Sequence, residues 1–377
     1  MASAAAAHNP PFRAEQVGSL LRPPELMKGR EELKAGRLTP AQLHEIEDHA
    51  IREVVAFQER VGLQSVTDGE YRRETFFSAF YMQGLGGLQY DFETPGDWFF
   101  TDRKGHKIPM VNIKVTGRSQ WKQPVHVDDF KFLSALTKRM VKITLPSPTH
   151  IHCRAGRANI SSAVYPDLDL FWDDVVDAFR KELKALGDAG CRYVQIDETT
   201  LPCLPDPHAR ELMAKRREDW RKLMLEIYPA IMNRCFEGRP AGMHLAMHLC
   251  RGNNQGHWSS EGGYDLFADT LFNQINVDSY FLEYDTPRAG TFEPLRFVPK
   301  NKTVVLGLIS TKFPELESKD EIKRRIDEAA KFCDLDQLAL SPQCGFASAY
   351  AGNPIPTGIQ EAKLKLVVDT AREVWGA

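Results

Sequence analysis

The sequence has no apolar run long enough to cross a membrane and no tract of lysine and arginine. A membrane-spanning helix needs about 20 consecutive apolar residues, and binding to nucleic acid needs a concentrated basic face. The 377 residues carry 48 Lys and Arg against 51 Asp and Glu, a formal net charge of −3. We therefore expect neither a membrane protein nor a nucleic-acid-binding protein.

The N-terminus lacks the features of a secretory signal. Its first residues, MASAAAAHNPPFR, have neither a basic start nor a long apolar segment. The seven cysteines are an odd number and lack the tight spacing of a disulfide framework, which is typical of a reducing compartment. We therefore expect a cytoplasmic protein in which residues 1–11 form a disordered tail.

What the sequence does contain is a repeated alternation of short apolar runs and longer amphipathic segments. Apolar runs of this kind form strands that are buried on both faces of a parallel sheet. No run is followed by a G-x-G-x-x-G turn or a phosphate-binding loop, which argues against an open doubly wound sheet. We predict a single α/β domain over residues 12–377, a (β/α)8 TIM barrel, with strands at 16–19, 63–67, 141–145, 192–196, 243–249, 279–282, 303–308 and 337–340.

Several of the predicted helices carry clear signals. Thr39, followed by a proline and Gln42, predicts an N-terminal capping box, and Gly62 ends that helix. Residues 171–189 and 321–332 also have apolar residues at helical spacing. Residues 90–117 break the alternation and are predicted to form an inserted, hairpin-like excursion over one end of the barrel.

Four residues with metal-binding side chains follow late strands of the predicted barrel. His248 and Cys250 end the fifth strand two residues apart and so point the same way, Glu283 ends the sixth strand, and Cys344 follows the eighth. The C-terminal ends of barrel strands form the functional face of this fold. Two thiolates, an imidazole and a carboxylate suit Zn²⁺. We predict a zinc site formed by these four residues, although the H-x-C pair taken alone is also compatible with a chance pairing.

Another group of polar residues follows the early strands. Glu70 and Asp197 belong to acidic pairs that can hold a hydroxyl group, an amine or a metal, and the alternative is a set of salt bridges with arginines such as Arg22 and Arg72. Ser19 lies at a Gly-Ser corner, where free backbone N–H groups can bind a carboxylate. The alternative for Ser19 is an ordinary turn.

The motifs that carry these residues resemble a known family. The chain resembles the catalytic half of cobalamin-independent methionine synthase, and more closely its short, single-domain relatives, from about residue 12 to residue 375. The motifs are V-G-S-L-L-R-P at 17–23, D-G-E at 68–70, I-D-E at 196–198, H-L-C-R-G-N at 248–253, L-E-Y-D at 282–285 and S-P-Q-C-G-F at 341–346.

The resemblance implies a role for each matching residue. His248, Cys250, Glu283 and Cys344 match the zinc ligands of the family, and the family fold is a (β/α)8 barrel. Glu70 and Asp197 match the residues that hold the amino group of homocysteine, and with His248 they form the predicted catalytic group. Ser19 matches a residue that binds the homocysteine carboxylate. The implied reaction is attack of a zinc-bound thiolate on an alkyl carbon, most simply methylation of homocysteine to methionine.

The partners are small molecules, and their identity is left open. Full methionine synthases carry an additional N-terminal barrel, which is not recognisable in this sequence. The methyl donor is therefore left open, and a folate, a corrinoid protein or another small donor is expected. His150 and His152 are expected to contact that donor or to be solvated.

An epoxyalkane:coenzyme M transferase is the alternative, with an epoxide as electrophile and Arg22, Arg72 or Arg73 holding the sulfonate of coenzyme M. A structural zinc protein and a metal-free barrel similar to porphyrinogen decarboxylase are further alternatives. A homo-oligomer is compatible with each.

Overall fold

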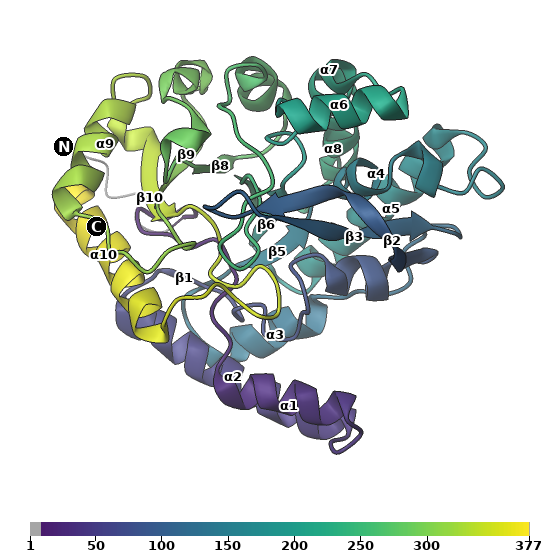
Figure 1. Ribbon diagram of the computed structural model, residues 1–377. Helices are drawn as coiled ribbons and strands as arrows, with labels where there is room; N and C mark the ends of the chain where they lie inside the picture. The colour runs from purple at the N-terminus through teal and green to yellow at the C-terminus, as the bar shows by residue number, and fades with distance from the viewer. Residues whose placement is uncertain (1–8, 377) are drawn as a thin grey trace.

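The computed structural model describes residues 9–376 (Figure 1). The predicted disordered tail, residues 1–11, lies outside the described residues except for its last three. Within residues 9–376, no helix is both long enough and apolar enough to span a membrane.

A parallel sheet of six strands forms most of the barrel wall, in the order β10-β9-β8-β7-β6-β5. A shorter parallel pair, β1 with β4, continues the wall, because β4 runs on into β5 after a single residue. The (β/α)8 fold predicted from the alternation of strands and helices is therefore confirmed. The strands are β1 (Ser65–Val66), β4 (Met140–Val141), β5 (Ile143–Pro146), β6 (Tyr193–Glu198), β7 (His244–Leu249), β8 (Ser279–Glu283), β9 (Thr303–Ile309) and β10 (Leu338–Pro342).

The first predicted strand, residues 16–19, is not a regular strand. Its backbone reaches β10 through hydrogen bonds that join Glu15 and Leu340 and that join Leu340 and Arg13, each of 2.9 Å. The segment therefore lies beside β10, in the first position of the barrel wall. Residues 16–18 do not extend this backbone pairing, because their carbonyl oxygens accept hydrogen bonds from side chains instead. The donors are Lys142, Gln195 and Thr67.

Helices surround the strands (Figure 1). The capping residues predicted for one of these helices are found at its two ends. Thr39 and Gln42 form the predicted capping box, and Gly62 ends the helix with φ 105°. The helices predicted at 171–189 and 321–332 are α5 and α9, each beginning and ending slightly earlier than predicted. The α-helices are α1 (Pro24–Lys34), α2 (Pro40–Val61), α3 (Val127–Leu136), α4 (His150–Ala155), α5 (Leu168–Asp188), α6 (Pro207–Arg216), α7 (Trp220–Lys222), α8 (Tyr228–Phe236), α9 (Lys319–Ala329) and α10 (Thr357–Trp375).

The excursion predicted at residues 90–117 is a hairpin. β2 (Leu88–Thr101) pairs antiparallel with β3 (Lys107–Val115). Thr101 and Trp258, in the loop after β7, exchange two backbone hydrogen bonds of 2.6 and 3.0 Å. The hairpin therefore spans the end of the barrel at which the strands finish, and Figure 1 shows it crossing in front of the sheet.

The barrel interior contains a buried ion pair. The Nζ of Lys142 lies 3.4 Å from the Oε2 of Glu15, and neither side chain is exposed. Tyr193 and Ser65 donate hydrogen bonds to the same carboxylate, at 3.1 and 2.6 Å. Lys142 also lies 4.6 Å from the ring centroid of Phe281. These polar contacts hold the first segment of the chain inside the sheet.

Replacement of Lys142 by Met should strongly destabilise the fold. The Glu15 carboxylate would stay buried without its cation, and removing one partner of a buried pair typically costs about 3–5 kcal/mol. Urea denaturation measures the free energy of unfolding. The control is Lys184→Met, which removes an exposed lysine paired with exposed Asp188 and should change stability little. Equal stability of the two variants would contradict the importance of the buried pair.

Candidate metal and substrate site

A cavity of about 350 Å³ opens at the C-terminal end of the strands, beneath the hairpin. Its inner end is polar and holds residues from the strand ends. Its outer part is mainly aromatic, because the hairpin and the segment after β1 contribute large rings. The polar lining includes Ser19, Glu70, Asp197, His248, Cys250 and Cys344, and the aromatic lining includes Phe76, Phe77, Tyr90, Phe92, Trp98 and Phe100.

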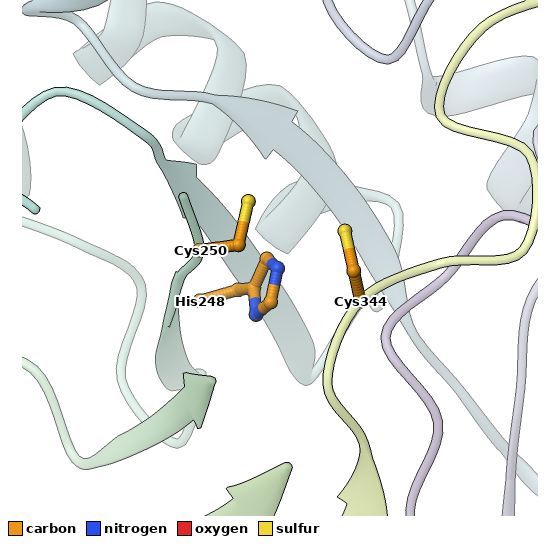
Figure 2. Close-up of side chains that lie close together, drawn as sticks. All are labelled: His248, Cys250 and Cys344. Atoms are coloured by element: carbon orange, nitrogen blue, oxygen red, sulfur yellow. The ribbon is translucent and has the colours of Figure 1, made fainter. Parts of the chain in front are cut away.

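Three of the four predicted metal ligands converge at the inner end of this cavity. The ligand atoms of His248, Cys250 and Cys344 lie within 4.8 Å of one another, and all three residues are buried. Figure 2 shows His248 and Cys250 on one stretch of chain and Cys344 facing them from another. Among the residues that the structure describes, neither ring nitrogen of His248 has a hydrogen-bond partner.

The two thiols of this group are not equivalent. A hydrogen bond from Cys250 and the adjacent His248 ring hold the pKa of Cys344 well below its ordinary value, and the same interaction raises the pKa of Cys250. Two sulfur ligands and an unpartnered imidazole are a donor set that fits zinc.

Glu283, the fourth predicted ligand, lies outside this group of three. Its carboxylate accepts a hydrogen bond of 2.7 Å from the backbone N–H of Arg251 and forms ion pairs with Lys312, at 3.3 Å, and Arg288. Burial alone would raise the pKa of Glu283, but Lys312, Arg288 and Arg251 hold it at about 2. Glu283 as a zinc ligand stays a prediction, because its carboxylate is already neutralised by neighbouring cations.

Glu70 and Asp197 line the cavity together, as the sequence predicts for a shared site. Thr144 donates a 2.7 Å hydrogen bond to the Oε1 of Glu70, whereas its Oε2 is buried and has no hydrogen-bond partner within residues 9–376. Gln195 donates a 2.8 Å hydrogen bond to Asp197. Burial raises the pKa of Asp197 to about 7, with a further contribution from the negative charge of Glu70. Arg73 is also buried and forms an ion pair with the Oε1 of Glu70 at 3.6 Å, so one salt bridge of the alternative prediction is present. The two carboxylates therefore form a buried acidic site to which Arg73 already supplies one positive charge.

The backbone around these acidic residues is unusual. Glu70 has φ 61°, in the left-handed region that non-glycine residues adopt mainly at constrained sites. Ser19 lies against Gly345, where a Cβ atom would be only 2.0 Å from the Ser19 Oγ. The Oγ of Ser19 accepts a hydrogen bond from the N–H of Ala347 at 3.3 Å. Its own proton therefore remains available to a ligand in the cavity.

Two other predicted substrate residues do not line the cavity. Arg22 donates hydrogen bonds to backbone carbonyls of the two loops that follow β1 and β10. Arg72 pairs with Asp48 and Asp129 and packs against the ring of Phe132. Both arginines hold the chain in place, and the geometry does not support a contact between them and a substrate in this cavity.

The aromatic lining was not assigned to the site from the sequence, whereas the two histidines of α4 were expected either to contact the donor or to be solvated. The solvated alternative for His150 and His152 is wrong, since the two side chains are 5% and 3% exposed. His150 lines the cavity, and His152 lies within hydrogen-bond distance of Tyr228 in the core, at 2.9 Å. The sequence signal for the aromatic lining was the density of rings in the excursion, but it did not indicate which rings face inward.

The fold and the cavity define a (β/α)8 barrel whose strand ends carry a thiol and imidazole cluster beside two acidic residues. Residues 12–373 match the family described as cobalamin-independent synthase, catalytic domain, and the chain belongs to this family. The resemblance inferred from the sequence motifs is therefore confirmed. Membership in this family supports a methyltransferase enzyme.

Individual relatives agree with the family assignment. The chain is 39% identical over 367 residues to the uncharacterized protein YxjH of Bacillus subtilis, with 97% of this chain and 95% of YxjH covered. It is 24% identical over 362 residues to the 5-methyltetrahydropteroyltriglutamate–homocysteine methyltransferase of Bacillus velezensis, with 95% of this chain but 42% of that protein covered. A crystal structure from Listeria monocytogenes, provisionally assigned as a vitamin-B12-independent methionine synthase, has 32% identity and a TM-score of 0.74, with 97% of this chain and 99% of that chain covered.

Replacement of Cys250 or Cys344 by Ala should remove bound zinc. Each change deletes a sulfur ligand from the group, whereas Cys203→Ala removes a thiol elsewhere in the same cavity wall and should leave the zinc content unchanged. Glu283→Gln should retain more zinc than either cysteine variant, because the carboxylate is held by cations. Elemental analysis of the purified proteins measures the metal. Full zinc content in both cysteine variants would contradict the site.

Proposed function

We propose that this protein transfers a methyl group to the sulfur of homocysteine and produces methionine, with zinc as its cofactor. The observation that carries the proposal is the presence of two different sites in one cavity of a member of this family. His248, Cys250 and Cys344 form the metal-binding end. Glu70 and Asp197 form the acidic site beside it. An amino acid with a terminal thiol has matching groups at its two ends.

The acidic site suits the amino group of homocysteine. The Oε2 of Glu70 has no hydrogen-bond partner among the described residues and can accept one from an ammonium group. The ammonium group adds a second positive charge, beside Arg73, to a site with two buried carboxylates. Gln195 and Thr144 keep the other carboxylate oxygens in place. Ser19 can donate its hydroxyl proton to the substrate carboxylate, since its Oγ already accepts from Ala347.

The metal end suits the thiol. Zinc bound by His248, Cys250 and Cys344 would lower the pKa of a substrate thiol and keep it as a thiolate near neutral pH. In the transfer, the substrate sulfur forms a bond to the methyl carbon while the bond between that carbon and the donor breaks, and the donor keeps the electron pair. The hairpin covers part of the cavity, and the residues of the acidic site hold the substrate in a fixed orientation.

The name of the Bacillus velezensis relative makes a methyltetrahydrofolate the first donor to test. A corrinoid protein is the second, and the aromatic outer cavity can accept a flat ring system in either case. Purified zinc-loaded protein should be offered homocysteine with each donor, and coenzyme M with an epoxide, and the products identified by mass spectrometry. Methionine supports the proposal, and a coenzyme M thioether as the only product would overturn it.

A variant tests the acidic site separately. Glu70→Gln should raise the KM for homocysteine by about tenfold or more, because a charged hydrogen bond to the ammonium group is lost. The control substrate is 4-mercaptobutanoate, which is homocysteine without its amino group. The wild-type enzyme should prefer homocysteine to this analogue, and the variant should lose the preference. An unchanged preference in the variant would show that Glu70 does not bind the amino group.

A further inference from the structure

Helix α4 places two nitrogen-bearing side chains, His150 and Arg154, in the wall of the outer cavity. They lie four residues apart and therefore on the same face of the helix. Both are distant in sequence from the metal and acidic sites, and neither has a part in the reaction proposed above. The same cavity wall carries aromatic rings of the hairpin together with the polar side chains of Glu74, Thr75 and Thr199.

Arg154 has no carboxylate partner among the described residues. Its guanidinium donates one hydrogen bond, to the backbone carbonyl of Val111 in the hairpin, and its Nε is buried without a partner. The charged and titratable groups closest to it include Tyr90, Cys153 and Arg216, none of which carries a negative charge at neutral pH. The side chain is half-buried and lines the cavity, so an anion in the cavity would gain a charge-assisted hydrogen bond from it.

His150 offers a second polar atom beside it. The ring packs against Phe77 and Tyr81, with centroids 5.1 and 6.1 Å away, and its Nδ1 lies 3.1 Å from the hydroxyl of Thr199. Its Nε2 is buried and has no partner in the part of the chain that the structure describes. Burial and the charge of Arg154 lower the pKa of His150 well below its ordinary value, so the ring is neutral and can donate one hydrogen bond from Nε2.

The cavity therefore has buried carboxylates at its inner end, and at its outer end Arg154, which forms no ion pair within residues 9–376. Glu74 lines the same cavity and does not pair with Arg154. We propose that Arg154 and His150 bind an anionic group, a carboxylate or a sulfonate, on the alkyl donor, while the apolar body of the donor packs against the rings of the hairpin. The assignment of the anionic group to the alkyl donor rests on the methyl transfer proposed above. The existence of an anion site between α4 and the hairpin does not depend on it.

The test uses benzoate, benzenesulfonate and the uncharged isostere benzamide as probes, with binding to the full-length protein measured by calorimetry. Benzoate or benzenesulfonate should bind at least about tenfold more tightly than benzamide, since a charged hydrogen bond is formed only with the anions. Equal binding of all three would overturn the proposal without any variant. The better of the two anions identifies the preferred group.

Arg154→Met should abolish the preference for the anion and leave benzamide binding unchanged. Arg103→Met is the matched control, because it removes an arginine of the hairpin tip that pairs with Glu315 and should keep the preference. Arg154→Gln is the second variant if the first does not fold. Retention of the preference in a folded Arg154 variant would overturn the assignment.

Measuring benzoate binding in the presence of saturating homocysteine shows whether the anion site binds the alkyl donor or the thiol substrate. Benzoate binding that is unchanged by homocysteine supports a separate donor site, and displacement of benzoate by homocysteine would assign Arg154 to the thiol substrate and overturn the proposal. These measurements involve no turnover. A protein that binds benzoate but makes no methionine would therefore contradict the proposed function and leave the anion site intact.

Discussion

Three consecutive backbone carbonyls near the start of the chain are bound by side chains rather than by a neighbouring strand. This arrangement holds residues 16–18 inside the barrel wall and places Ser19 at the end of the cavity, against Gly345 and near Glu70. The donors come from three other positions of the wall, so the first segment is tied to most of the sheet at once. The side chains involved are Lys142, Gln195 and Thr67.

The strands and the convergence of two thiols with an imidazole were predictable from the sequence for a simple physical reason. Strands buried on both faces need continuous apolar runs, and side chains at the ends of such strands meet at one edge of a barrel. The same rule brings His248, Cys250 and Cys344 together. The prediction of a regular strand at residues 16–19 was wrong. A hydrogen bond from a distant lysine or glutamine side chain to a backbone carbonyl cannot be seen in the local hydrophobic pattern.

The partners of the charged residues could not be predicted. Arg22 and Arg72 follow strands just as Glu70 does, but Arg22 holds two loops and Arg72 pairs with acidic residues of α2 and α3. Glu283 lies at the expected strand end, but its carboxylate forms ion pairs with Lys312 and Arg288. In each case the decisive neighbour is set by the packing of loops and helices, about which the sequence pattern carries no information.

The hairpin joins the loop after β7 through the paired backbone groups of Thr101 and Trp258. Most of the aromatic roof of the cavity belongs to this hairpin, so moving the roof as one piece requires both of these hydrogen bonds to break. Displacement of the hairpin from the barrel is then coupled to a local opening of the backbone. Amide-hydrogen exchange at these two residues therefore reports directly on how often the hairpin moves away from the barrel.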